Sequence, residues 1–197
     1  MKKAFIFVLT IISFMWLSAN YIKSGNIQEV KASSTVQEEI SKPVYKTITY
    51  YDVPLDLDFQ DYLREECKKN NVELELVLAV MKVESNYNSE VISSTADHGI
   101  MQINECNHEN LSNKLNIDNY LDPYQNAKAG IYMLSNLSWC ENDTQRLMCY
   151  NMGVTGAKRA WNKGIYETGY TKKVLQAKSE LGGKQYEIKI LCDKNCK

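Results

Sequence analysis

The chain has 197 residues, which is enough for one domain with additional segments at its ends. Hydrophobic residues make up 44% of it and charged residues 24%, a composition that allows a packed core and excludes a wholly disordered chain. The formal net charge of −1 supplies no basic field, so no nucleic-acid partner is expected.

The first residues are typical of an export segment. Two lysines follow Met1, and an apolar stretch from Ala4 to Leu17 comes next. We expect residues 1–32 to be a signal cleaved after Ala19 or Ala32 or, if uncleaved, a membrane anchor. In both cases the body of the protein is predicted to lie outside the cytoplasm, extracellular or at the cell envelope.

Three segments follow the export segment. Residues 33–55 are predicted to be a linker, in which KTITYYDV can form a short strand. A folded domain is predicted for residues 56–181, starting at a helix cap on Asp56 or Asp58 and ending before two glycines. Residues 182–197 form a cysteine-containing tail with a strand-like middle, for which the sequence indicates no function.

Six cysteines fit an exported chain, because an even count there suggests disulfides, with fifteen possible pairings. The tail cysteines are expected to staple the tail onto the domain, whereas Cys149 can equally be a free thiol in the core. No metal site is expected, because the spacing lacks a second metal-like cysteine pair and the chain has two histidines. The six cysteines are Cys67, Cys106, Cys140, Cys149, Cys192 and Cys196.

The stretch from Leu74 to Val83 has the length and residue types of a buried helix. At about 100° per residue, Glu75 and Lys82 share one polar stripe, whereas Glu84 falls on the opposite side. There it stacks over apolar residues at i−7, i−4 and i−3, which are Val77, Val80 and Met81.

The position of Glu84 has a chemical consequence. A carboxyl group on an apolar face loses hydration, and in the last turn of a helix it also meets unsatisfied carbonyl groups. Both effects raise its pKa, and a carboxylic acid that stays protonated near neutral pH can act as a general acid. The alternative is a glutamate that caps a neighbouring backbone or pairs with a buried cation.

Four sequence blocks in order resemble the soluble lytic transglycosylase family and its goose-type lysozyme relatives. The first reads AVMKVESNYN and then SSTADHGIMQIN, and the second reads DPYQNAKAGIYML. The third is RLMCYNMG, and the fourth is YTKKVL. Together the blocks lie within residues 57–181, so the resemblance covers the predicted domain.

This resemblance implies a mainly α, lysozyme-like fold with a cleft between two lobes, with or without a small β element. It implies cleavage of the β-1,4 bond between N-acetylmuramic acid (MurNAc) and N-acetylglucosamine (GlcNAc) in peptidoglycan glycan strands, with formation of a 1,6-anhydro ring and without a cofactor. Glu84 would be the general acid and base. The implied substrate-binding residues are Ser85, Ser93, Gly99, Met101, Gln102, Tyr150, Asn151 and Tyr170.

Several of these positions have a structural alternative. Ser85 and Ser93 can be helix or turn hydrogen bonders, Met101 can pack in the core, and Tyr150 can lie in the core with its hydroxyl on a partner. Asn126, which matches the family's second block, is expected to hold the structure rather than the substrate.

Asp97 keeps a second reaction open. Animal-type lysozymes have an aspartate just before a similar glycine motif, and glycoside hydrolysis normally uses two carboxylates. Glu84 and Asp97 could therefore form a hydrolytic pair, although Asp97 can also be a turn former. A third alternative is a non-catalytic domain that binds glycan or supports an envelope machine for secretion or conjugation.

Overall fold

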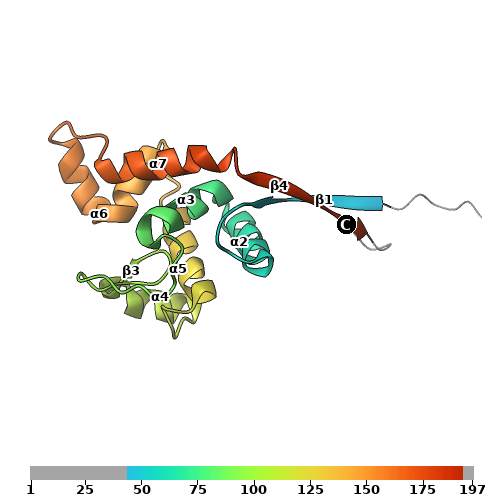
Figure 1. Ribbon diagram of the computed structural model, residues 1–197. Helices are drawn as coiled ribbons and strands as arrows, with labels where there is room; N and C mark the ends of the chain where they lie inside the picture. Colours follow the sequence, from blue (N-terminus) through green and yellow to red (C-terminus); the bar gives the residue numbers. More distant parts are fainter. Residues whose placement is uncertain (1–43, 193–197) are drawn as a thin grey trace, which may run out of the picture. The chain divides into compact units, whose positions relative to one another are not determined.

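The computed structural model describes residues 44–192 (Figure 1). The export segment and Cys196 lie outside this part, so cleavage and anchoring stay predictions. Within the described range, the helices lack the combination of length and apolarity that crossing a membrane requires. The predicted mainly α fold with a small β element is confirmed.

Six α-helices make up most of the described chain. They are α2 (Leu57–Asn70), α3 (Leu74–Ser85), α4 (His108–Leu115), α5 (Pro123–Ser135), α6 (Asp143–Trp161) and α7 (Gly169–Leu181). A short 3-10 turn, η1 (Glu105–Asn107), leads into α4. Two antiparallel strand pairs complete the fold: β1 (Val44–Tyr51) with β4 (Gln185–Cys192), and β2 (Asp97–His98) with β3 (Ile103–Asn104).

Side-chain caps start three of the helices, one of them at Asp56, a cap position that the sequence predicted. Asp56, Asp122 and Asn142 each accept a hydrogen bond from the backbone N–H three residues later, at 2.7, 2.8 and 2.9 Å. Pro123 occupies the first turn of α5, where its missing N–H costs nothing. A cap of this kind is worth about 1 kcal/mol, so these residues fix both the start and the stability of their helices.

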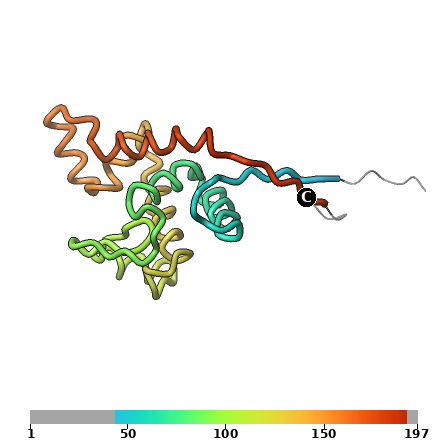
Figure 2. The backbone as a smooth tube through the Cα atoms, in the orientation of Figure 1, coloured from blue at the N-terminus to red at the C-terminus, as the bar shows by residue number. Residues whose placement is uncertain are grey.

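Helix α3 is the buried centre of the domain. Residues 76–81 have no exposed surface, which is expected of a helix that is apolar on all sides. Figure 2 shows α3 crossing beside α7, on which it packs. The Lys178 ammonium on α7 pairs with the carboxylates of Glu73, at 2.7 Å, and Asp143, at 2.8 Å. This bridge joins the starts of α3 and α6 to α7.

Strands β1 and β4 pair over their whole length, from Val44 opposite Cys192 to Tyr51 opposite Gln185. Residues 44–51 lie in the predicted linker, and their strand overlaps the KTITYYDV segment for which a short strand was expected. Neither strand alone has an alternation of polar and apolar residues that would predict the pairing. The ladder forms because the end of α7 delivers β4 alongside the segment that precedes α2 (Figure 1).

A second apolar cluster lies apart from the main core, and it includes two cysteines near the start of α6. Its buried members are Leu137, Cys140, Met148, Cys149 and Ala157. Cys149 is a free buried thiol, which is one of the two alternatives, disulfide or free core thiol, that the sequence left open. Cys67, Cys106 and Cys140 are also free. The expected staple involves the tail cysteines Cys192 and Cys196, whose side chains lie outside the described part of the chain, so it stays a prediction.

Candidate active site

Glu84 lies in the last turn of α3, and a hydroxyl group from α7 reaches it. The Tyr170 hydroxyl donates a hydrogen bond to Glu84 Oε1 at 2.6 Å. This contact joins residues 86 positions apart, and it exists because α3 and α7 pack side by side. Tyr170 therefore touches the candidate acid rather than open solvent, and the substrate binding expected of it stays a prediction.

The surroundings of Glu84 raise its pKa from 4.5 to about 7. Burial makes the largest contribution, because the charged form loses hydration. The hydrogen bond from Tyr170 acts in the opposite direction, and the negative charge of Asp97 raises the pKa further. A carboxyl group with this pKa can give up a proton and take one back near neutral pH, which suits both steps of general acid–base catalysis.

The neighbours of Asp97 lower its pKa, in contrast to the raised pKa of Glu84. Partial burial tends to raise its pKa, but hydrogen bonds outweigh that effect and the pKa is lowered from 3.8. The Thr95 and Ser93 hydroxyls donate to Oδ2 at 2.6 and 2.7 Å, and the Asn104 amide donates to Oδ1 at 2.8 Å. Asp97 is therefore a fixed carboxylate, and Ser93 acts as the turn hydrogen bonder that was one of its two predicted roles.

The fold requires glycine at position 99. It is buried with a φ of 76°, and a Cβ atom there would lie 2.3 Å from the Tyr120 carbonyl oxygen and 2.4 Å from Asn126 Nδ2. Asn126 is fully buried and binds the backbone carbonyls of His98 and Tyr120 and the N–H of Met101. The expected substrate contact of Gly99 stays a prediction, whereas the hydrogen bonds of Asn126 agree with the structural role predicted for it.

Met101 also points away from the cavity. Its side chain has no exposed surface and packs on Gly130, where a Cβ atom would lie 2.4 Å from the methionine sulfur. The Met101 side chain is thus enclosed in this structure, and its binding of substrate stays a prediction. The alternative of core packing is the one that the structure supports.

Ser85 and Gln102 hold the segment between β2 and β3. The Ser85 hydroxyl donates to the carbonyl oxygens of Ile100, at 2.8 Å, and Met81, at 3.2 Å. The Gln102 amide donates to the carbonyl oxygens of Gly99 and Val91 at 2.8 and 3.1 Å. Ser85 thus ties α3 to this segment, while Gln102 joins the segment to Val91 and also lines the cavity that contains Glu84.

Tyr150 and Asn151 reach the cavity from α6. The Tyr150 hydroxyl donates to the Met101 carbonyl oxygen at 2.9 Å, and burial raises the Tyr150 pKa well above its ordinary value. Asn151 lies exposed at the cavity edge. At Gly153 the helix breaks, with φ 71° and ψ 159°, so the polypeptide turns directly after this pair. Tyr150 and Asn151 line the same cavity as Glu84, and their binding of substrate stays a prediction.

These side chains enclose a small cavity of about 120 Å³. Sequence reasoning missed three of its lining residues, Asn104, Asn107 and Met133. Asn104 closes the Gly99–Asn104 stretch that ends at β3, but Asn107 and Met133 come from other elements and carry no motif of their own. The cavity has two carboxyl groups and three asparagines, a lining that suits a polar, uncharged ligand such as a sugar. In residues 44–192, no group of three His, Cys, Asp or Glu side chains is arranged to hold a metal ion.

Comparison with known proteins agrees with this arrangement. Residues 61–174, more than half of the chain, match the Transglycosylase SLT domain. The chain belongs to the transglycosylase SLT domain family. The matched residues of this SLT domain include the Glu84 helix, the β2–β3 segment, Tyr150 and Tyr170.

Two solved structures share the fold of this SLT domain. One is an inactive Glu-to-Gln mutant of the lytic transglycosylase Slt from Pseudomonas aeruginosa, at 19% identity and a TM-score of 0.55 over 63% of this chain and 24% of that one. The other is the 70 kDa soluble lytic transglycosylase from Escherichia coli, at 19% identity and a TM-score of 0.54 over 61% and 23%. The chain thus matches about a quarter of the length of each relative.

Proposed function

We propose that this SLT domain is a lytic transglycosylase that cleaves the MurNAc-β-1,4-GlcNAc bond of peptidoglycan and forms a 1,6-anhydromuramic acid end. The observation that carries the proposal is Glu84, a carboxyl group with a pKa of about 7 that faces a polar cavity. Family membership supports the reaction class, and the inactive Glu-to-Gln mutant of the Pseudomonas aeruginosa protein is consistent with a catalytic glutamate.

Glu84 performs both proton transfers in this proposal. The protonated carboxyl group donates its proton to the glycosidic oxygen as the bond from that oxygen to C1 of MurNAc breaks. The resulting carboxylate then removes the proton of the C6 hydroxyl of the same sugar, while that oxygen bonds to C1. Glu84 ends protonated, as it began, and no water is consumed. No cofactor is required, because the substrate supplies its own nucleophile.

The neighbours of Glu84 have distinct roles. Tyr170 occupies Oε1, which leaves Oε2 to carry the transferable proton, and its hydrogen bond stabilises the carboxylate after the first step. Asn151 and Gln102 present amide groups at the cavity wall, where they can bind the acetamido and hydroxyl groups of the sugars. Tyr150 holds the Met101 carbonyl and so fixes the wall opposite Glu84.

Hydrolysis by the lysozyme route is the second candidate. It is favoured by one observation, which is that Asp97 lines the same cavity as Glu84 and has a lowered pKa. A permanently ionised carboxylate beside a protonated one is the pattern of a hydrolytic pair. Three side-chain hydrogen bonds already engage the Asp97 oxygens, however, which favours a supporting role over attack on the sugar or on water.

Mass spectrometry of digested peptidoglycan separates these reactions. We expect the muropeptides released by the purified chain to end in 1,6-anhydromuramic acid, lighter by one water than a reducing end. Reducing ends that borohydride can label would establish hydrolysis instead. Glycan binding without any released fragments would establish the third candidate, a non-catalytic envelope scaffold.

The cellular setting is part of the proposal. We propose that residues 1–32 direct the chain out of the cytoplasm, to the compartment that holds peptidoglycan, either as a cleaved signal or as a membrane anchor. There it can remodel the wall or open it for an envelope-spanning secretion or conjugation machine. Fractionation of expressing cells, combined with sequencing of the mature N-terminus, distinguishes a cleaved signal from an anchor.

A further inference from the structure

Two cysteines meet in the second apolar cluster, near the start of α6. Cys140 lies in the loop between α5 and α6, and Cys149 lies nine positions later, inside α6. Both thiols are free and buried in this structure, and they are hydrogen-bonded to each other. The two sulfur atoms therefore need only small side-chain rotations to reach the length of a disulfide bond, which is about 2 Å.

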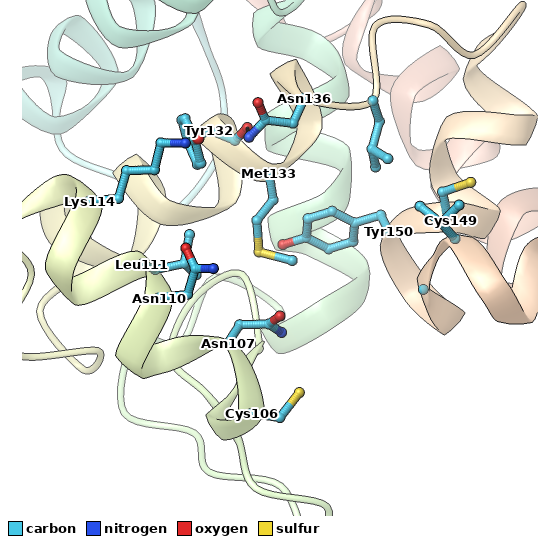
Figure 3. Close-up of a pocket in the computed structure, with 13 residues that line it drawn as sticks. Cys106, Asn107, Asn110, Leu111, Lys114, Tyr132, Met133, Asn136, Cys149 and Tyr150 are labelled. Atoms are coloured by element: carbon cyan, nitrogen blue, oxygen red, sulfur yellow. Dashed lines mark hydrogen bonds between the residues drawn. The ribbon is translucent and has the colours of Figure 1, made fainter.

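The other two cysteines with described side chains lie elsewhere. Cys67, on α2, is buried in the main core, whereas Cys140 and Cys149 belong to the second cluster. Cys106 is exposed, and Figure 3 shows Cys106 and Cys149 on different walls of a cavity of about 560 Å³. Among the four described cysteine side chains, Cys140 and Cys149 are thus the pair in contact.

The Cys140 thiol lies just beneath the surface of the molecule. Its neighbours in the loop, Trp139 and Glu141, are both exposed. A small opening of this loop would therefore uncover the Cys140 sulfur without disturbing the main core. An oxidant in solution can reach the pair by this movement.

Burial and nearby cations act on the two thiols in opposite directions. Burial raises the pKa of Cys140 to about 11, while the Arg146 guanidinium lowers it. Burial also raises the pKa of Cys149, while the Lys158 ammonium lowers it. Because the thiolate is the reacting form, the two cations favour oxidation of the pair, whereas the same burial shields a completed bond from reductants.

We propose that Cys140 and Cys149 form a disulfide bond when the chain meets an oxidant that itself contains a disulfide, such as glutathione disulfide or a thiol oxidoreductase. One cysteine thiolate attacks a sulfur of the oxidant, which forms a mixed disulfide and releases half of the oxidant as a thiol. The second cysteine thiolate attacks the protein sulfur of the mixed disulfide and releases the other half. The two cysteines lose two electrons and two protons, and the oxidant takes up both. Compartments outside the cytoplasm contain such oxidants.

The bond links the first part of α6 to the loop that follows α5. Cys149 directly precedes Tyr150 and Asn151, and α6 breaks soon afterwards, at Gly153. A covalent link one residue before Tyr150 therefore restricts the movement of this pair at the cavity that contains Glu84. It also removes conformational freedom from the unfolded chain, which stabilises the folded one.

Peptide mapping tests the bond directly, because trypsin cleaves after Arg146, between the two cysteines. Cys140 then falls in the peptide 129–146 and Cys149 in the peptide 147–158, and neither peptide contains another cysteine. The folded chain is incubated with glutathione disulfide, and its remaining thiols are alkylated before digestion. We expect one linked species whose mass is the sum of the two peptides less two hydrogen atoms. Reduction should separate it into its two parts.

Two results of this mapping would overturn the proposal. One is alkylation of both cysteines after the oxidant has been added to the folded chain. The other is a bond from Cys140 or Cys149 to Cys106, to another cysteine or to glutathione in place of the linked pair.

Thermal unfolding tests whether the bond stabilises the fold. We expect the Tm of the oxidised chain to exceed that of the reduced chain by about 5–10 °C, because the bond closes a loop of about ten residues. Cys140→Ser and Cys149→Ala should each lose this difference, whereas Cys106→Ser, at an exposed thiol outside the pair, should keep it. The variants at both ends of the bond keep the test decisive if one of them fails to fold. A linked pair without a change in Tm would overturn the stabilising role, and so would a difference that persists in either variant.

Discussion

Glu84 and Asp97 line the same small cavity, and their surroundings shift their pKa values in opposite directions. Glu84 stands at the end of a buried helix with one hydrogen-bond donor, so the loss of hydration dominates. Asp97 stands in a short turn near the surface with three donors, so its charge is stabilised. The comparison indicates that the number of donors per carboxylate, together with burial, assigns the proton to Glu84.

The largest expected effect is on catalysis by Glu84→Gln. Removal of the proton carrier should lower the rate of muropeptide release by about 10²–10⁴-fold. The amide can still accept the Tyr170 hydrogen bond, so the fold should remain intact by circular dichroism. Glu90→Gln, at an exposed glutamate that does not line the cavity, serves as the control and should retain full activity. Comparable losses in both variants would contradict the assignment.

The same substitution should change how stability depends on pH. Because the folded pKa of about 7 lies above the ordinary 4.5, folding favours the protonated form of Glu84. This contribution is fully present below pH 4.5 and is lost as the pH rises through 7, with a difference of about 3 kcal/mol. Urea unfolding at pH 5 and pH 8 should therefore show that Glu84→Gln loses less stability than wild type. Equal losses of stability in the two proteins between pH 5 and pH 8 would mean that Glu84 is solvated.

Tyr170→Phe tests the role of hydrogen-bond donors, because it removes the one side-chain donor to Glu84 among the described residues. The carboxylate form then becomes less stable, so the pKa of Glu84 rises above about 7 and the descending limb of the pH–rate profile moves to higher pH. We expect the rate at neutral pH to fall about tenfold. Tyr166→Phe removes an exposed hydroxyl and should leave the profile unchanged.

Asp97→Asn should have the smallest effect if the reaction is a transglycosylation. Loss of the negative charge lowers the pKa of Glu84, so the descending limb moves to lower pH, in the direction opposite to Tyr170→Phe. The maximal rate should change by roughly threefold or less, because water screens charges in a part-solvated cavity. A loss as large as that of Glu84→Gln would make Asp97 a direct participant and would favour hydrolysis.

The candidate acid could be predicted from the sequence because helical periodicity is a local property. Glu84 falls on the apolar side of its helix whatever surrounds it. Helix caps such as Asp56, Asp122 and Asn142 are also local features, because each bonds the backbone three residues later. The family pattern added Tyr150 and Tyr170, and the structure shows that their hydroxyls contact the Met101 carbonyl and Glu84.

The roles within the Gly99–Gln102 segment could not be separated in the same way. A motif shows which residues occur together, but burial decides which of them touch a ligand. Met101 faces Gly130 and not the cavity because α5 packs closely there, and that approach depends on a contact 29 residues along the chain. Asn107 and Met133 were missed for the same reason, since only the packing of α4 and α5 brings them to Glu84.

The paired strands β1 and β4 have a mechanical consequence. Val44 lies opposite Cys192, so both ends of the described chain leave the ladder at the same rung. Tension applied between the two ends would open the hydrogen bonds one after another, like a zipper, from Val44 and Cys192 towards Tyr51 and Gln185. The ribbon would therefore lengthen when its two ends at Val44 and Cys192 are pulled apart, before the force reached the helices that hold Glu84.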